Sequence, residues 1–198
     1  MAGVSAPTTC ASVNDGLYPK SNAGATAATS CYLPLAPNQY IDATTETVKT
    51  GCPAGYFCPG ANVSADATPV DGMMGAASCK NFGDMYTSDA NTIVPMAEET
   101  AGAQNVANVK QRMTDAGLDA SVAKFGCYAN VPAGSYKNGS WAAATLETCP
   151  AGTWSGAHRS YMSIDTTDAE CNACPSGYTS GDATGLTSEA DCFGGYQF

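Results

Sequence analysis

Few side chains in this sequence could do chemistry. His158 is the only histidine, so the chain offers one imidazole base and excludes multi-histidine metal sites. It stands in the segment GAHRS beside Arg159, with no nucleophile placed near it by a recognised motif, and we interpret it as an exposed loop residue. Cys171 and Cys174 have the spacing of a redox pair, but that chemistry needs a thioredoxin-like strand and helix. The sequence therefore predicts no catalytic residue, no metal site and no cofactor, and we expect that the protein is not an enzyme.

The composition indicates where the protein works. Ten cysteines, an even number, lie in turn-rich segments of a chain of 198 residues, which is typical of a disulfide framework formed in an oxidising compartment. The net charge of −10 disfavours binding to nucleic acid or to an anionic membrane surface. No apolar run approaches the length of a membrane span. We expect an extracellular or cell-surface protein.

The first ten residues, MAGVSAPTTC, are not a secretory signal, because they lack a basic region and an apolar region. We expect either that the signal has been removed or that export uses another route.

The C-terminal part contains a tandem repeat between residues 149 and 192. Each copy opens with Cys-Pro-Ala/Ser-Gly, continues through a loop rich in Gly, Thr and Ser, and closes with an acidic segment and a cysteine, TTDAEC or TSEADC. Weaker echoes are CPAGYFCPG at 52–60 and VPAGSY at 131–136, where Val131 takes the place of the cysteine. Proline followed by a small residue and glycine predicts a tight reversal at 53–55, 150–152 and 175–177.

This pattern resembles the ephrin-receptor-like cysteine-rich repeat, a small extracellular module written roughly as C-P-x-G, turn residues, then C-x-x-C-P-x-G. Such repeats occur in receptor ectodomains, in protist surface antigens and in proteins of flagellar hairs. The resemblance is strong only over residues 149–192. It implies an extracellular scaffold rather than a reaction.

Modules of this size bury too little apolar surface to fold without crosslinks. We prefer pairings that close one repeat each, Cys149 with Cys171 and Cys174 with Cys192, and a similar loop closed by Cys10 with Cys31. For the other four cysteines the hypothesis is Cys58 with Cys79 and Cys52 with Cys127. Ten cysteines allow about 945 connectivities, and the sequence does not choose among them. The aromatic residue after each turn, Tyr56, Trp154 or Tyr178, is expected to lie over a disulfide as a core residue.

We predict a small disulfide-rich fold, mostly β and irregular, with a short α-helical insert. The regions are a cysteine-rich N-terminal region at 1–79, a cysteine-free helical insert at 80–126, and tandem cysteine-rich repeats with an aromatic C-terminal tail at 127–198. Alternation predicts strands at 31–34 and 39–48.

In the insert, a helix is expected to begin at Pro95 and to end at Gly117. Val106, Val109 and Met113 would form its apolar face. A second short helix is predicted at 118–125, and we expect this insert to hold the main hydrophobic core.

Two further patterns concern the surface. Asn62 and Asn138 each begin an N-glycosylation triplet, although the same triplets also read as plain polar turns. The tail FGGYQF places Phe193, Tyr196 and Phe198 in six residues, too short a segment to bury three aromatic rings by itself. It therefore folds back onto its own domain or docks on a neighbouring molecule.

Two functions fit the sequence. The first is an extracellular structural subunit of a cell-surface fibre, coat or flagellar hair, glycosylated and self-assembling through its termini into a homo-oligomer or filament. The alternative is a monomeric ligand-binding cysteine-rich module of a surface receptor or antigen.

Overall fold

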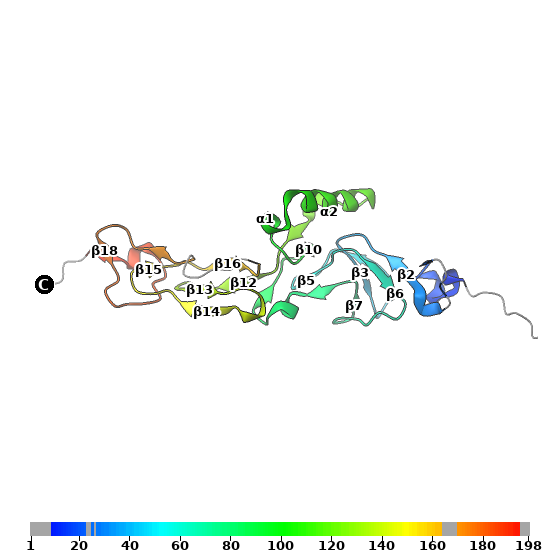
Figure 1. The fold of residues 1–198 in the computed structure, drawn as a ribbon, viewed down its shortest axis with the longest axis horizontal. Coiled ribbons are helices and arrows are strands. Elements are labelled where there is room, and N and C mark those ends of the chain that lie inside the picture. The colour runs from blue at the N-terminus through cyan, green and yellow to red at the C-terminus, as the bar shows by residue number, and fades with distance from the viewer. Residues whose placement is uncertain (1–8, 23–24, 26, 164–169, 195–198) are drawn as a thin grey trace, which may run out of the picture.

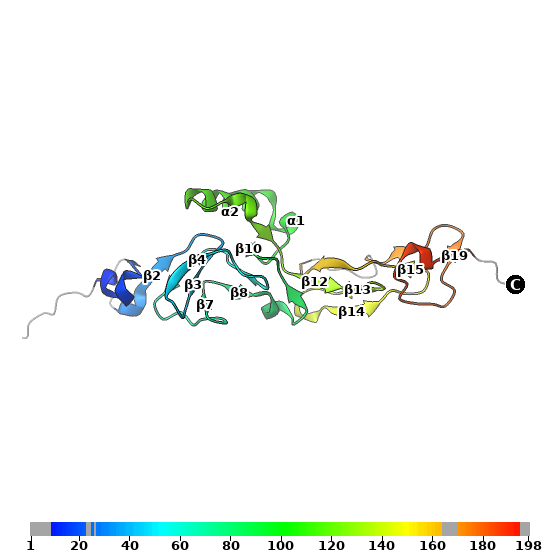
Figure 2. The same cartoon turned by 180° about the vertical axis from the view of Figure 1, so that it is seen from behind.

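The computed structural model describes residues 9–22, 25, 27–163 and 170–194. It is an elongated body in which short strands and turns follow one another from the N-terminal end to the C-terminal end (Figure 1, Figure 2). The two helices stand off one side near the middle of this body (Figure 1). The predicted fold class, disulfide-rich and mostly β and irregular with a short helical insert, is confirmed.

Two three-stranded antiparallel sheets build the N-terminal part. One contains β1 (Lys20–Ser21), β2 (Cys31–Pro34) and β6 (Asn62–Ser64), and the other contains β3 (Gln39–Asp42), β4 (Thr47–Thr50) and β7 (Met73–Met74). The segment predicted as one strand at 39–48 is split into β3 and β4. The carboxylate of Asp42 accepts from the amides of Thr44 and Thr45, and Glu46 has a positive φ of 52°, so the chain reverses there.

Short strands continue along the rest of the body. They are β5 (Tyr56–Phe57), β8 (Ala77–Ser78), β9 (Tyr86–Thr87), β10 (Thr92–Val94), β11 (Lys124–Phe125), β12 (Tyr128–Val131), β13 (Ser135–Asn138), β14 (Thr145–Thr148), β15 (Thr153–Trp154), β16 (His158–Tyr161), β17 (Asn172–Ala173), β18 (Tyr178–Thr179) and β19 (Phe193–Gly194). β16, β12 and β9 form an antiparallel sheet, whereas β10 pairs with β11 in parallel. Antiparallel pairs join β5 to β8, β13 to β14, β15 to β17 and β18 to β19.

The insert contains α1 (Glu98–Ala101) and α2 (Ala103–Asp115). The helix begins later than predicted, and Gly102 interrupts it because its φ of 78° and ψ of 141° are not helical. Gly117 has a φ of 72° and follows the last turn, which agrees with the predicted stop. Val106 and Met113 are buried, so the predicted apolar face is the one that packs.

The predicted second helix at 118–125 is wrong. Asp119 accepts a hydrogen bond from the amide of Ser121 and caps only a single 3₁₀ turn at Ala120–Val122. Lys124 and Phe125 then pair with β10 as β11. The strand partner supplies backbone hydrogen bonds that a short isolated helix lacks.

The apolar core consists of three clusters rather than one. In the N-terminal sheets Tyr18, Ile41 and Val63 pack together. The middle cluster surrounds Cys79, Cys127 and Met162, and the insert cluster contains Ile93, Val106, Met113 and Phe125. The insert therefore holds one part of the core, and each cluster stabilises only its own stretch of the elongated body.

Five disulfides crosslink the chain. They join Cys10 to Cys31, Cys52 to Cys58, Cys79 to Cys127, Cys149 to Cys171 and Cys174 to Cys192. The first and the last two are the predicted pairs. The hypothesis for the other four cysteines is wrong: the reversal at 53–55 brings the Cα atoms of Cys52 and Cys58 to 5.8 Å, while those of Cys79 and Cys127 are 5.7 Å apart.

The disulfides differ in the length of chain that they close, which predicts different losses of stability. Replacing both Cys79 and Cys127 by alanine removes a link across 48 positions, and replacing Cys52 and Cys58 removes one across 6. The chain-entropy model gives losses of about 4 and about 2 kcal/mol, respectively. Equilibrium unfolding in guanidinium chloride measures both, with the wild-type chain as reference. Equal losses from the two double variants would contradict this account.

Candidate functional site

The repeated geometry of the molecule is a turn built on Pro-x-Gly. It occurs in four places, at 52–55, 131–134, 149–152 and 174–177, which we call the first to the fourth turn unit. In each, the residue after glycine donates its amide hydrogen to the proline carbonyl, at 2.9–3.2 Å. The glycines have φ between 77° and 87°. The three predicted reversals are confirmed, and the segment with Val131 makes the same turn without a cysteine.

A first set of hydrogen bonds closes each of the first three units on its own hairpin. Cys79 donates its amide to the carbonyl of Gly55, Cys149 to that of Gly134, and Cys174 to that of Gly152, each at 2.9 Å. Because Cys149 and Cys174 also open the third and fourth units, the end of one hairpin is the beginning of the next turn. The units are thus linked in series.

A second set joins each turn to a more distant segment. The amide of Gly55 donates to the carbonyl of Ser88 at 3.0 Å, and that of Gly134 to the carbonyl of Ser155 at 2.8 Å. In the third unit, Gly152 donates to Oγ of Ser180 at 2.6 Å. These three serines are almost fully buried, with exposures of 1–2%. These serines were not predicted from the sequence. The pattern that could have identified them is a serine directly after a short strand, as in Thr87-Ser88, Trp154-Ser155 and Thr179-Ser180.

Two further backbone hydrogen bonds recur in the first and third units. Asn91 donates its amide to the carbonyl of Cys52 at 2.7 Å, and Gly185 donates to that of Cys149 at 2.9 Å. Six positions after the opening residue, Cys58 donates to Thr92 and Ser155 donates to Leu186, both at 3.0 Å.

We call these three interactions the docking contacts. They use the amide of the turn glycine, the carbonyl of the opening residue, and the amide six positions after that residue. The first and third units make all three with backbone or serine partners from later in the chain.

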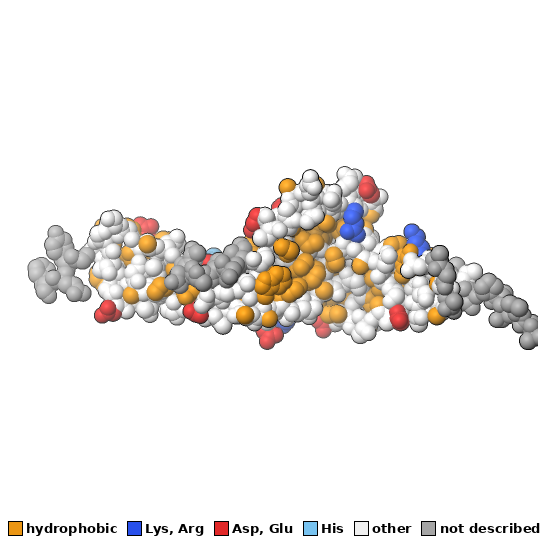
Figure 3. Space-filling model, in the orientation of Figure 1, with side chains coloured by type: hydrophobic (Ala, Val, Ile, Leu, Met, Phe, Trp, Pro, Cys, Tyr) orange, Lys and Arg blue, Asp and Glu red, His pale blue; other side chains and the backbone are white. Residues whose placement is uncertain are grey.

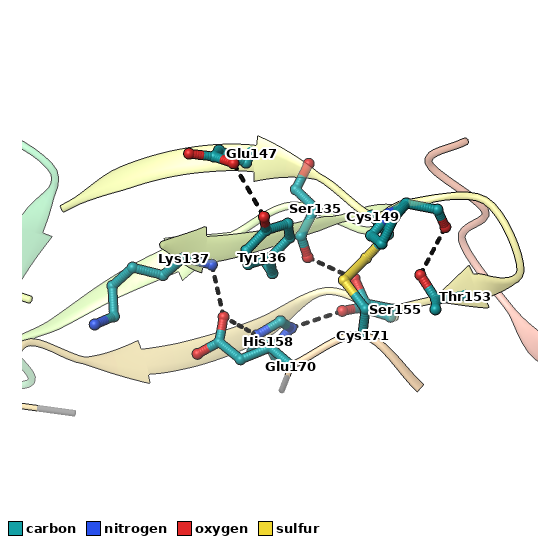
Figure 4. Close-up of a disulfide and its surroundings, with 12 residues drawn as sticks. Ser135, Tyr136, Lys137, Glu147, Cys149, Thr153, Ser155, His158, Glu170 and Cys171 are labelled. Atoms are coloured by element: carbon teal, nitrogen blue, oxygen red, sulfur yellow. Dashed lines mark hydrogen bonds and ion pairs between the residues drawn. A yellow bond between two sulfur atoms is a disulfide. The ribbon is translucent and has the colours of Figure 1, made fainter. Parts of the chain in front are cut away.

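The second unit replaces one backbone partner by a side chain. Lys137, six positions after Val131, donates its amide to the Glu170 carboxylate at 2.7 Å, and Figure 4 shows this carboxylate between Lys137 and His158, near the disulfide of Cys149 and Cys171. His158 Nε2 lies 3.0 Å from Glu170 Oε2, and Nδ1 lies 2.9 Å from the carbonyl of Gly156. Both ring nitrogens therefore lie close to oxygen atoms. The reading of His158 as an exposed loop residue is wrong, because it belongs to β16 and its side chain is 30% exposed.

The environment of Glu170 has two opposite effects on the pKa of its carboxyl group. Burial raises the pKa, and hydrogen bonds from the Lys137 amide, the Ser160 hydroxyl and His158 lower it. The hydrogen bonds prevail, so the pKa lies below the ordinary value of a glutamate. Glu170 is therefore an ionised structural acceptor at neutral pH.

The cysteines that the sequence analysis considered as a redox pair have a structural role as well. Cys171 and Cys174 bond to different partners, and every cysteine is in a disulfide, so no dithiol pair exists in the folded chain. Within the described residues, no group of three or more His, Cys, Asp or Glu side chains could hold a metal ion. None of the helices in that part of the chain is long and apolar enough to cross a membrane.

The predicted glycosylation sites differ in access. Asn62 is exposed at the start of β6. Asn138, in β13, is half-buried and donates from Nδ2 to Oε1 of Glu147 at 2.8 Å.

The predicted assembly residues are placed in part. Phe193 folds back in β19 beside β18, yet it is 46% exposed, while Tyr196 and Phe198 lie outside the described residues. Tyr178 is 54% exposed, so the expectation that it forms a core over a disulfide is wrong. Along the described chain, no later turn unit follows to cover it.

The comparisons with known proteins give no relative: no family model matches the sequence, and neither a curated protein nor a solved structure matches it significantly.

The docking contacts predict that the turn glycines differ in how well they tolerate replacement by alanine. A Cβ on Gly134 would clash with the carbonyl of Gly185, whereas a Cβ on Gly152 meets nothing within 4 Å. Both have a left-handed φ, so Gly152→Ala should cost about 1 kcal/mol of folding free energy. Gly134→Ala should cost about 2 kcal/mol more, because it also overpacks the contact. Urea unfolding at equilibrium measures the difference; equal costs would show that this close approach is unimportant.

The Glu170 carboxylate predicts a stability that depends on pH. Its pKa is depressed in the folded state relative to about 4.3 in the unfolded chain, so its contribution is complete above about pH 5.5. It is lost as the pH falls through the folded pKa. Glu170→Gln should lower the unfolding free energy by about 2 kcal/mol at pH 7 and by much less at pH 3.

Denaturant midpoints at both pH values give the result, with Glu189→Gln, at an exposed position, as control. A deficit for Glu170→Gln that is as large at pH 3 as at pH 7 would refute the role of the ionised carboxylate.

Proposed function

We propose that this protein is an extracellular structural subunit of a cell-surface fibre, coat or flagellar hair. The observation that carries the proposal is the repetition of one set of docking contacts along an elongated body (Figure 1). Each unit is held by backbone hydrogen bonds and a nearby disulfide rather than by a large apolar core. Such a series of hydrogen-bonded and crosslinked units suits an extended scaffold.

The disulfide content supports the extracellular part of this proposal. Five disulfides persist in oxidising surroundings and are rare where thiols are kept reduced. The third and fourth units each carry the disulfide that closes one repeat, as we expected. Glycans at Asn62 and Asn138 are part of the proposal, with Asn62 the more accessible of the two.

Self-assembly through the termini is the finer part of the proposal. The N-terminal and C-terminal parts lie at opposite ends of the body (Figure 1, Figure 2), so a contact between unlike ends can repeat without limit. Phe193 supplies exposed apolar surface at one of these ends, and the sequence that follows it adds Tyr196 and Phe198.

One observation favours the alternative, a monomeric ligand-binding module. Beneath α2 is a hollow of about 550 Å³, lined by Val94, Met96, Val109 and Phe125 among others. Figure 3 shows apolar side chains gathered below this helix on one face. A hollow of this size and character is typical of small-molecule sites. We rank it second because it lies beside the insert, away from the repeated units.

The structural proposal predicts polymers of the native chain. Electron microscopy and sedimentation of the disulfide-bonded protein should show regular assemblies. Combining Phe193→Ser with deletion of residues 195–198 removes the three aromatic rings and keeps Gly194 and all cysteines. This change should raise the concentration needed for assembly by more than about tenfold, because aromatic contacts dominate interface energies.

Val122→Ser, at an exposed apolar position in the insert, is the matched control and should assemble normally. Dispersed single particles of the wild-type chain would overturn the structural proposal in favour of the ligand-binding module. Normal assembly of the tail variant would remove only the role of the aromatic rings.

A further inference from the structure

In the described part of the chain, the docking atoms of the fourth turn unit are unused. By analogy with the first and third units, these atoms are the amide of Gly177, the carbonyl of Cys174 and the amide of Ser180. Among the described residues, none of the three has a hydrogen-bond partner. The corresponding atoms of the third unit are bonded to Ser180, Gly185 and Leu186.

Gly177 is exposed and Cys174 is half-buried, so their unused amide and carbonyl mark an open strand edge, whereas Ser180 is almost fully buried. β18 pairs with β19 on one side, with Thr179 opposite Phe193. On its other side, the third unit's strand β15 has a parallel backbone bridge from Trp154 to Leu186, whereas nothing in the described chain occupies the equivalent place beside β18. An open edge is a template for a strand from another molecule.

The side chains around this edge are aromatic and acidic. Tyr178 and Phe193 are 54% and 46% exposed. Asp182 and Glu189 are exposed nearby in sequence, and residues 160–198 contain no lysine or arginine. A partner that matches this edge needs an extended backbone and a positive charge.

The other end of the molecule offers both features. β1 is the outer strand of its sheet, paired only with β2 among the described strands. Its two residues, Lys20 and Ser21, are exposed, and Lys20 carries the positive charge. β1 lies at the end of the body opposite β18 (Figure 1, Figure 2).

We infer that the open edge of β18 in one copy binds strand β1 of a second copy, with Lys20 facing Asp182 and Glu189. The contact repeats outside the chain the docking that joins its units inside, by strand addition. It is heterologous, since each copy offers a different surface at each end, and it propagates as a filament unless its rotation closes a ring. This inference rests on the proposed self-assembly and specifies the two surfaces that meet.

Hydrogen exchange tests the edge directly. Exchange is run on the monomer and on the assembled protein, which is then quenched and dissociated before the amides are read. The amide of Gly177 should exchange rapidly in the monomer and at least about tenfold more slowly in the assembly. That of Gly152, the matched position in the third unit, should be protected in both states. Protection of Gly177 already in the monomer, or none in the assembly, would overturn the inference.

A charge exchange tests the identity of the partner strand. Lys20→Glu should raise the concentration for half-assembly by more than about tenfold in sedimentation, because like charges then meet. Adding Asp182→Lys and Glu189→Lys to the same chain should restore assembly. The matched controls, at exposed positions away from both ends, are Lys49→Glu and Glu99→Lys and should behave as wild type.

The outcomes separate the two proposals. If wild-type protein assembles while Lys20→Glu has no effect beyond that of Lys49→Glu, or is not rescued by the two acidic-to-lysine changes, the β1 contact is overturned and the structural function stands. If wild-type protein remains monomeric at every concentration tested, both fall.

Discussion

The structure depends on the amide of the turn glycine. In each internal turn unit this amide points away from its own hairpin and donates to a serine from later in the chain. The left-handed φ of glycine directs it there, and a Cβ would oppose that backbone in all four units. One conformational property therefore fixes both the reversal of the chain and the place where the next segment binds.

Hydrogen bonds can carry this role because the apolar clusters are small and separate. A net contribution of about 1 kcal/mol per bond would be minor beside a large core. Here each unit has few apolar contacts, so the buried serines and the disulfides decide whether it is ordered. The pair of Glu170 and His158 shows the same requirement, since a carboxylate takes the place of the strand carbonyl that the amide of Lys137 would otherwise need.

The sequence predicted those features that are local. Proline and glycine positions were sufficient for the turns, cysteine spacing for three disulfides, and the spacing of apolar residues for the helical face of Val106 and Met113, because each depends on neighbours within one repeat or one helix. The pair of Cys79 with Cys127 was missed, since it depends on how separate segments meet, and Cys52, only six positions from its partner Cys58, was wrongly assigned to Cys127. The same holds for Ser88, Ser155 and Ser180: nothing in their own sequence shows that they meet a glycine 21–33 positions earlier. His158 was misread for this reason, because its partner Glu170 lies twelve positions later, in a turn before β17.

When units are joined by one kind of contact, each unit presents the same hydrogen-bonding atoms to a further unit. Every unit offers the same donors and acceptor to its successor, and within the described residues the fourth offers them to nothing. A globular protein avoids such an edge by covering it with a helix or by placing cations along it. Here both α-helices of the described residues stand near the middle of the body (Figure 2), and residues 160–198 contain no lysine or arginine. Because the docking contacts are made by backbone atoms, an extended segment of another molecule can make them at the fourth unit, and the side chains of the edge determine which segment fits. The regularity of these contacts, on which the proposed scaffold role depends, is thus also the property that leaves the fourth unit able to bind another molecule.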